Sequence, residues 1–457
     1  MQKSLFLKFG MIAAVLVLIG ISLIMINAVI EERSEFHAMA VRSIAEDSVG
    51  PQALAGPVLV IPFTEEFQEK REVDTPGGRQ VSMEKRSVQR RHIVFPNELK
   101  VKGAVDTDRR YRGIHEVLVY SGQYAVSGDI DVPSAAQLKA KYPNSVLTFG
   151  QPFVAVHVGD VRGLRNSPVL TLDGRKAEFQ QGANLRTYSS GVHAPLPDFD
   201  LVTARRARFA FSVNLDGIER QEFVPIAKNT EVTVSSPWPH PQFTGRFLPS
   251  PRDRTISADG FAATWRVSSL ASNAQQQFLN AESANPNDVA AARGAVDRFA
   301  VGFVEPVNVY SLADRATKYG LMFVALTFAA FFVFEMLRQL QIHPVQYALV
   351  GLALALFFLL LVSLSEKIPF ASAYLIASTG CIALITFYLR FVMGHWLRAL
   401  GFGAALSVLY GALYGLLVSE DMALMLGSLL LFAVLAAVMV TTRNINWYRV
   451  GAPAAAP

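Results

Sequence analysis

Cysteine is almost absent from this sequence, which contains one such residue, Cys381, in 457 positions. Cys381 lies within a long apolar run, so the polar part of the chain contains no thiol. A disulfide framework, a zinc-thiolate site and a cysteine nucleophile are therefore excluded from that part. A polar region of this length can bury a sufficient hydrophobic core without such cross-links.

Charged side chains are also scarce. They make up 17% of the residues, whereas soluble domains carry roughly 25%, and 51% of the residues are hydrophobic. The apolar residues gather in blocks at the two ends of the chain, so much of it does not face water. We attribute the formal net charge of +5 to Lys and Arg at the cytoplasmic ends of spanning helices. Since no basic run is interleaved with aromatic residues, we expect no nucleic-acid binding.

Six apolar runs are long enough to span a bilayer, which takes about 20 residues. In the first, residues 9–30, the only strongly polar member is Asn27. This run is longer than a signal-peptide core of about 7–15 residues, and no clear cleavage site follows it. We therefore predict an uncleaved anchor in residues 1–30. A bundle of five further spans is predicted over residues 317–442, at about 319–337, 345–364, 368–389, 396–418 and 422–440.

The distribution of basic residues predicts the orientation of these spans, because cytoplasmic loops are enriched in Lys and Arg. The short outer loops would contain one basic residue, Lys367. The inner flanks and loops would contain seven: Lys3, Lys8, Arg338, Arg390, Arg398, Arg443 and Arg449. We therefore expect both termini in the cytoplasm, with a tail over residues 443–457, and residues 31–316 on the outer side.

Residues 31–316 show mainly the period-two alternation of half-buried strands. Phe209, Phe211 and Val213 alternate with small or polar residues, and Val154–Val158 behaves similarly. Residues 31–49 lack Gly and Pro and should extend the anchor helix. The Asp-Gly pairs at 173–174 and 216–217 predict hairpin turns. Short helices are expected near residues 134–142 and 287–300.

These patterns predict a membrane protein with six α-helical transmembrane spans, one before and five after a large, mainly antiparallel β domain. The β domain would be either a single sandwich or two β subdomains.

Motifs of catalysis are missing. The sequence has no GxSxG, HExxH, Walker or GxGxxG motif. None of its eight histidines pairs with another at metal-ligand spacing. His157 falls on the polar parity of its strand and is expected to face solvent. We predict no catalytic set, no metal site and no cofactor.

One basic cluster could bind an anion or a partner: Arg109, Arg110 and Arg112, which surround Tyr111. An anionic lipid headgroup or a glycan would suit these guanidinium groups. The structural alternative is an arginine-rich turn whose charges are paired within the chain. Its partners would be Asp106, Asp108 and Glu116.

Two features of the predicted bundle stand out. Glu335 is the only acidic residue within a span, and an ion pair with Arg338 near the inner end of that helix would account for it. A row of small residues recurs every four positions, which brings its members close to one face where another helix can approach. That helix-packing row comprises Gly403, Ser407, Gly411 and Gly415.

Several long motifs in order along nearly the whole chain resemble the inner-membrane CreD family, often described as cell envelope integrity proteins. They are GPVLVIPF at residues 56–63, RYRGIHEV at 110–117, GRFLPS at 245–250, TWRVSSL at 264–270, IHPVQY at 342–347 and LYGALYG at 409–415. The resemblance implies the inner membrane of a Gram-negative bacterium, a link to the Cre two-component regulon, and a role in envelope integrity or stress tolerance. It implies no catalytic residues.

Two functions are therefore considered. The first is a non-enzymatic inner-membrane protein whose periplasmic β domain binds an envelope protein, lipid or glycan. The second is an enzyme or carrier for an envelope lipid or glycan that uses the basic cluster around Arg110 and Arg112. A deep apolar pocket beside that cluster would favour the second function, and a closed core with no cleft would favour the first.

Overall fold

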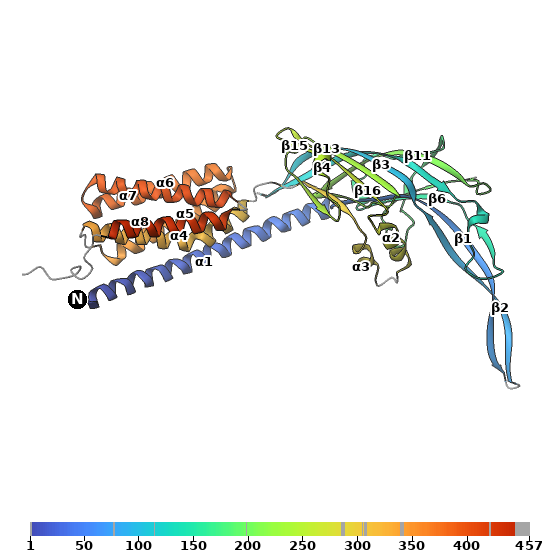
Figure 1. Ribbon diagram of the computed structural model, residues 1–457, viewed down its shortest axis with the longest axis horizontal. Coiled ribbons are helices and arrows are strands. Elements are labelled where there is room, and N and C mark those ends of the chain that lie inside the picture. The colour runs from blue at the N-terminus through green and yellow to red at the C-terminus, as the bar shows by residue number, and fades with distance from the viewer. Residues whose placement is uncertain are drawn as a thin grey trace, which may run out of the picture. The chain divides into compact units, whose positions relative to one another are not determined.

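The structure is a computed structural model that describes residues 2–75, 78–113, 115–197, 199–284, 288–303, 305, 309–338, 342–419 and 422–443. The chain divides into two compact units (Figure 1). One unit consists of Met1–Met39 and Val307–Pro457, and the other of Ala40–Pro306. We call them the helical unit and the β unit.

Six helices among the described residues are long and apolar enough to cross a membrane, which confirms the predicted number of spans. The first precedes the strands and the other five follow them along the chain. They are α1 (Gln2–Asp47), α4 (Val309–Arg338), α5 (Pro344–Ser365), α6 (Phe370–Met393), α7 (Trp396–Val418) and α8 (Ala423–Thr442).

Helix α1 continues without a break through residues 31–47, as the absence of Gly and Pro predicted. Helix α4 begins ten residues before the apolar run that revealed it, because its first turns are too polar for hydropathy to detect. Within the helical unit, Ile19 and Leu23 of α1 pack into the same core as Phe323 and Phe328 of α4 and Tyr347 of α5.

The β unit contains two sheets, which are mainly antiparallel as predicted. The only parallel pairs among the described strands are β1 with β12 and β3 with β13. The first sheet has the order β14-β17-β12-β1-β6-β10-β9, with β2 and β5 also paired to β1. Its strands are β1 (Gln52–Thr75), β2 (Gly78–Val94), β5 (Val146–Phe149), β6 (Phe153–Val158), β9 (Gln180–Gln181), β10 (Gly191–Pro195), β12 (Arg220–Phe223), β14 (Pro241–Gly245) and β17 (Phe299–Phe303).

The second sheet has the order β15-β16-β13-β3-β4-β11-β7-β8. Its strands are β3 (Pro96–Arg112), β4 (His115–Val132), β7 (Val169–Leu172), β8 (Arg175–Glu178), β11 (Arg205–Ile218), β13 (Asn229–Ser236), β15 (Arg254–Ser257) and β16 (Gly260–Ser268).

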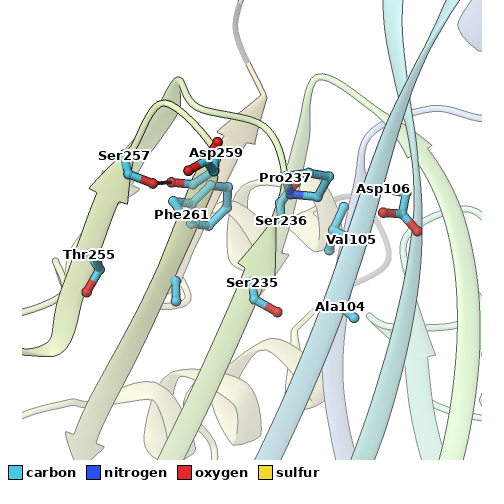
Figure 2. Close-up of a pocket in the computed structure, with 12 residues that line it drawn as sticks. Ala104, Val105, Asp106, Ser235, Ser236, Pro237, Thr255, Ser257, Asp259 and Phe261 are labelled. Carbon is cyan, nitrogen blue, oxygen red and sulfur yellow. Dashed lines mark hydrogen bonds between the residues drawn. The ribbon is translucent and has the colours of Figure 1, made fainter.

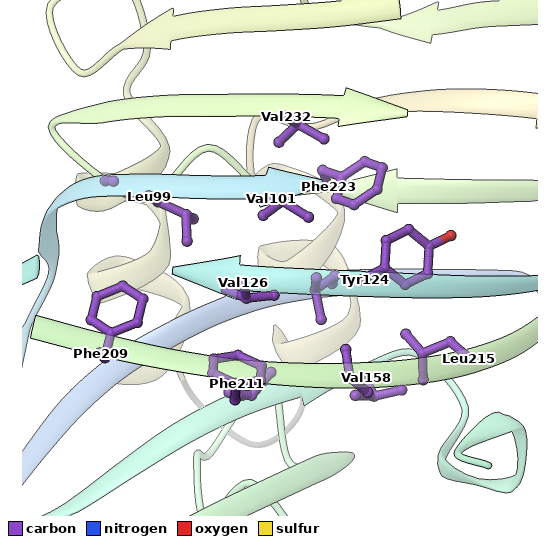
Figure 3. Packing of buried hydrophobic residues seen from close by; sticks show 14 of the residues in the cluster. Leu99, Val101, Tyr124, Val126, Val158, Phe209, Phe211, Leu215, Phe223 and Val232 are labelled. Atoms are coloured by element: carbon purple, nitrogen blue, oxygen red, sulfur yellow. The ribbon is translucent and has the colours of Figure 1, made fainter. Parts of the chain in front are cut away.

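The two sheets share one hydrophobic core, so the β unit is a sandwich (Figure 3). Val101 of β3 and Phe211 of β11 belong to the second sheet, and Val158 of β6 and Phe223 of β12 belong to the first. In β11 the buried residues alternate with exposed ones, as the sequence predicted. Alternation of this kind fits a sheet with one face on the core and the other in solvent.

One of the two predicted Asp-Gly turns is wrong. Asp173 and Gly174 do join β7 to β8, and both have a positive φ, as a two-residue hairpin turn requires. Asp216 and Gly217 instead lie inside β11, paired with β4. Gly217 serves close packing: a Cβ there would overlap the hydroxyl of Tyr120 and lie 2.6 Å from its Cζ.

The predicted helix near residues 134–142 is reduced to a single 3₁₀ turn, Ala135–Gln137. The backbone N–H groups of Lys141 and Tyr142 donate to the buried carboxylate of Glu65, at 2.6 and 2.8 Å, and not to helical carbonyls. A side chain distant in sequence therefore determines the local structure.

The second predicted helix, near residues 287–300, is shorter than expected. It is α3 (Val289–Gly294), and the chain then enters β17; Asn287 lies outside the described residues. Helix α2 (Ala274–Ser283) was not predicted, and it buries Ala274, Phe278 and Ala281.

Candidate functional site

The arginine cluster lies at the end of the β3–β4 hairpin, and two of its three guanidinium groups contact the last residue of α1 and the residue that follows it. Arg110 donates to Ser48 Oγ at 2.9 Å, and Arg112 forms an ion pair with Asp47. Arg109 pairs with Glu116 at 2.6 Å, as the structural alternative predicted. The sequence did not reveal the contacts to Asp47 and Ser48, because more than 60 residues separate the partners.

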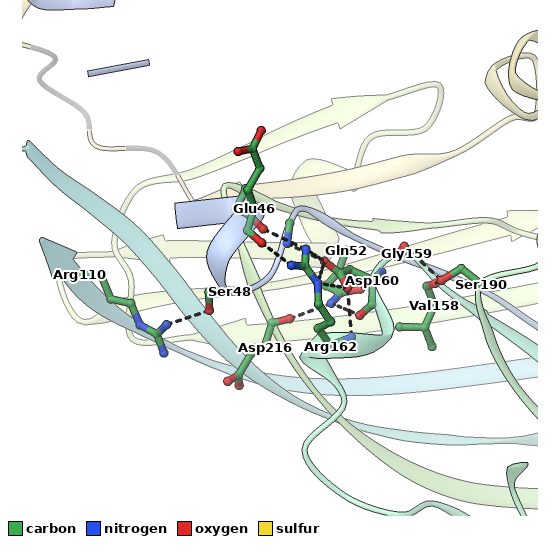
Figure 4. Close-up of polar contacts among 12 residues, drawn as sticks. Glu46, Ser48, Gln52, Arg110, Val158, Gly159, Asp160, Arg162, Ser190 and Asp216 are labelled. Carbon is green, nitrogen blue, oxygen red and sulfur yellow. Dashed lines mark hydrogen bonds and ion pairs between the residues drawn. The ribbon is translucent and has the colours of Figure 1, made fainter. Parts of the chain in front are cut away.

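The C-terminal end of α1 is held by an arginine that sequence reasoning missed (Figure 4). Arg162 donates to the backbone carbonyls of Ala45, at 3.0 Å, and Glu46. The last carbonyls of a helix lack partners within the helix and carry partial negative charge, so a guanidinium satisfies both their hydrogen bonding and their dipole. Asp160 holds Arg162 through an ion pair of 2.6 Å. Hydrogen bonds from Arg162 are the main reason that the pKa of Asp160 lies below its usual value.

Gln52 connects this helix end to the sandwich. Its buried side-chain amide donates to the carbonyls of Asp160, at 2.9 Å, and Asp216, at 2.8 Å, while its side-chain oxygen accepts from the Asp160 N–H at 3.1 Å. A buried amide with all these bonds made fixes its surroundings strongly, because losing any one leaves a desolvated polar group. The clamp formed by Gln52, Asp160 and Arg162 therefore joins the C-terminal end of α1, which belongs to the β unit, to the strands.

The prediction that His157 faces solvent is wrong, since its side chain is fully buried. Strand β6 lies inside the first sheet, and both of its faces are covered. His157 Nδ1 lies 2.7 Å from the Ser190 carbonyl, and Nε2 lies 2.9 Å from Arg293 Nη2. A carbonyl can only accept and a guanidinium can only donate, so Nδ1 carries the proton and the ring is neutral. Burial, and then the charge of Arg293, lowers the pKa of His157 to about 4.

The pocket that the structure describes beside the arginine cluster is small and partly acidic. The pocket at Arg110 has a volume of about 170 Å³, and its lining includes the carboxylates of Asp106, Asp108 and Asp216. A wider and shallower hollow of about 470 Å³ lies over β3, β13, β15 and β16, where Ser235, Ser257 and Asp259 face it (Figure 2). Within the described part of the chain, no three His, Cys, Asp or Glu side chains are placed to hold a metal ion.

In the helical unit, Glu335 is buried and joins the end of α4 to the start of α5. Its carboxylate accepts from Tyr347 Oη at 2.9 Å and from the Ile342 N–H at 3.2 Å. The predicted pairing with Arg338 involves a side chain outside the described ones. The contacts that the structure does describe give Glu335 a structural role between two helices.

The row of small residues in α7 packs inside the bundle at one position only. A Cβ on Gly403 would overlap Oγ1 of Thr386 in α6, so glycine permits close approach there. Ser407, Gly411 and Gly415 are exposed, and a Cβ on either glycine would meet open space. Of the four predicted helix-packing positions, the structure therefore shows close packing at Gly403, because four-residue spacing identifies a face but not what covers it.

Together, the six apolar helices and the two-sheet sandwich define a multi-pass membrane protein with a large β domain. The chain matches the family described as "Inner membrane protein CreD" over residues 4–448. It is also 35% identical over 457 residues to Inner membrane protein CreD of Escherichia coli (strain K12), which covers 99% of this chain and 96% of that protein. The chain belongs to the CreD family of inner membrane proteins, as the sequence motifs indicated.

Among solved structures, two similar ones are an M1 zinc metallopeptidase from Deinococcus radiodurans and native yeast LTA4 hydrolase. Each is 10% identical to this chain with a TM-score of 0.19. The first similarity covers 38% of each chain, and the second covers 47% of this chain and 30% of the hydrolase. The matched part is less than half the length of either enzyme.

Proposed function

We propose that this inner-membrane protein supports cell envelope integrity and stress tolerance by binding an envelope partner through its β unit. The observation that supports this function is the end of the β3–β4 hairpin, which we call the hairpin tip: Arg110, Tyr111 and Arg112. Tyr111 is 67% exposed there, between two exposed arginines.

The hairpin tip has the composition of a binding hot spot. Tyrosine and arginine are enriched among the residues that dominate binding energies. The contacts of Arg110 with Ser48 and of Arg112 with Asp47 hold both side chains in place before any partner arrives. Each guanidinium has five N–H donors, so donors remain for a second acceptor. A partner that offers anionic or carbonyl oxygens beside an aromatic-binding surface would fit, whether it is an envelope protein, lipid or glycan.

Binding is favoured over catalysis or lipid transport because of the size of the pocket. Sites for small molecules usually have about 300–1,000 Å³ and a mostly apolar lining. The pocket beside Arg110 has only about 170 Å³, and its lining includes three carboxylates.

We expect Tyr111→Ala to lower survival under envelope stress while the protein accumulates normally, because an exposed side chain contributes to binding but little to folding. Survival of cells that lack the chromosomal copy and carry full-length variants would be measured together with protein level. The matched control is Leu248→Ala, which removes a side chain that is 63% exposed in another loop. The binding proposal fails if cells with Tyr111→Ala survive envelope stress as well as cells with Leu248→Ala, while replacement of one buried polar residue abolishes survival at a normal protein level.

The proposal includes an orientation in which both termini are cytoplasmic and the β unit is periplasmic, supported by the excess of basic residues on the inner flanks. In a Cys381→Ser background, new cysteines at Ser121 and Lys367 should react with a membrane-impermeant thiol reagent in cells with a permeabilised outer membrane. A cysteine at His395 should react only after the inner membrane is opened. All three positions are exposed, so accessibility reports the side of the membrane. Labelling at His395 without labelling at Lys367 would reverse the orientation.

A further inference from the structure

A second polar pocket lies in the β unit, apart from the hairpin tip, with a volume of about 290 Å³. Its lining comes from the start of β1, from β12, and from the end of α3 and the segment after it. The residues that matter here are Gln52, Arg220, Glu222, Arg293 and Arg298. We call it the arginine pocket.

The arginine pocket has an excess of positive charge. Glu222 is shared between Arg220, at 3.1 Å, and Arg298, at 3.0 Å. Among the residues that the structure describes, no carboxylate pairs with Arg293. Three guanidinium groups therefore face a single carboxylate, and the neutral ring of His157 adds no charge.

The Arg293 guanidinium is held in position without being neutralised. It donates to His157 Nε2 at 2.9 Å and lies over the ring of Tyr188, 5.6 Å from its centroid. Arg298 Nη2 donates to the Arg293 carbonyl at 2.7 Å, which fixes the two arginines relative to each other. Withdrawing a cation from water without an opposite charge is unfavourable. An incoming anion would supply that charge and would meet donors that are already oriented.

Guanidinium groups suit one class of anion especially well. Their planar forks donate two parallel hydrogen bonds to phosphate or carboxylate oxygens. Three arginines around one cavity can surround a tetrahedral oxyanion, and the net charge of two positive units favours a phosphate over a singly charged carboxylate.

We propose that the arginine pocket binds a phosphate group, either as free inorganic phosphate or as the phosphate of a lipid headgroup. In this site Arg293 and Arg220 bind the oxyanion, Arg298 positions Arg293, and Glu222 keeps Arg220 and Arg298 beside the cavity. This inference goes beyond the envelope-binding function, because it concerns different residues and can be tested on the purified protein.

The test is calorimetric titration of the full-length protein, held in an uncharged detergent, with two separate probes. One probe is inorganic phosphate, and the other is dihexanoyl phosphatidic acid below its micellar concentration. We expect binding that weakens roughly 10- to 100-fold in Arg293→Gln and in Arg220→Gln, since each change removes a charge-assisted hydrogen bond. Binding should also weaken as salt is added.

The matched control is Arg175→Gln, which removes an exposed arginine from the β7–β8 hairpin and should leave the affinity unchanged. Thermal unfolding of each variant checks folding, and Arg293→Lys should restore part of the affinity because it keeps the charge without the fork. Tight binding of inorganic phosphate alone would identify the free ion, whereas tighter binding of the lipid with competition by phosphate would identify a headgroup. Failure of both probes to bind, or equal binding by the parent, Arg293→Gln and Arg220→Gln, overturns the proposal.

Discussion

Replacing Trp265 by alanine should destabilise the β unit by about 3–5 kcal/mol, the usual cost of truncating a fully buried aromatic side chain. Trp265 lies on β16 of the second sheet and is 1% exposed. Its ring stacks on Phe299 of β17, at a centroid distance of 5.3 Å, and meets Phe243 of β14 edge-on at 5.4 Å. The change therefore removes contacts that hold one sheet against the other. The loss should appear as a lower denaturant midpoint of the β-sheet circular dichroism signal.

A control for this prediction is Leu270→Ala. Leu270 is 97% exposed in the segment after β16, so its removal should leave the midpoint unchanged. If Trp265→Ala and Leu270→Ala unfold at the same denaturant concentration as the parent, the packing between the sheets does not stabilise the β unit as the structure indicates.

The second large effect is expected in the helical unit, at Gly351 of α5. A Cβ at this position would overlap Cδ1 of Ile19 in α1 and lie 2.8 Å from Cζ of Phe328 in α4. Leucine there would push neighbouring helices away, at a cost of about 1–3 kcal/mol or more for overpacking. Gly351→Leu should therefore lower the melting temperature of the detergent-solubilised protein and reduce its accumulation.

The matched comparison is Gly411→Leu, the same chemical change in α7. A Cβ at Gly411 meets nothing within 4 Å, and leucine favours helix by about 1 kcal/mol over glycine, so this variant should melt at or slightly above the parent temperature. Equal loss in both variants would mean that the exposed face of α7 is covered in the intact protein. Equal stability of both would contradict the close packing of α1 on α5.

Sequence reasoning succeeded where one dominant physical constraint acts on consecutive residues. A run of about 20 apolar residues has few stable alternatives to a membrane span, so the six helices could be predicted directly. In β11, alternation reports a sheet with one buried face, and the Asp173-Gly174 turn depends only on local backbone conformation. The pairing of Arg109 with Glu116 could also be predicted from the sequence, because both residues lie in one hairpin.

The remaining features depend on what covers each element, which no local pattern encodes. His157 has the parity of a solvent-facing residue, but β6 is covered on both faces, so the side chain is buried against Arg293. Gly217 follows an aspartate as a turn glycine would, but glycine is needed there because a Cβ would overlap the side chain of Tyr120.

The candidate sites themselves were decided by the tertiary structure. Arg162 meets the carbonyls of Ala45 and Glu46 across more than 110 residues of sequence. The arginine pocket similarly brings together β12 with the end of α3 and the segment that follows it. Hydrophobic patterning thus determined where this chain crosses a membrane and where it forms strands, because burial in lipid or in a core acts on every residue of a segment. Only the tertiary structure determines which charged side chains form pairs, because an ion pair depends on the distance in space between two side chains that can lie far apart in the sequence.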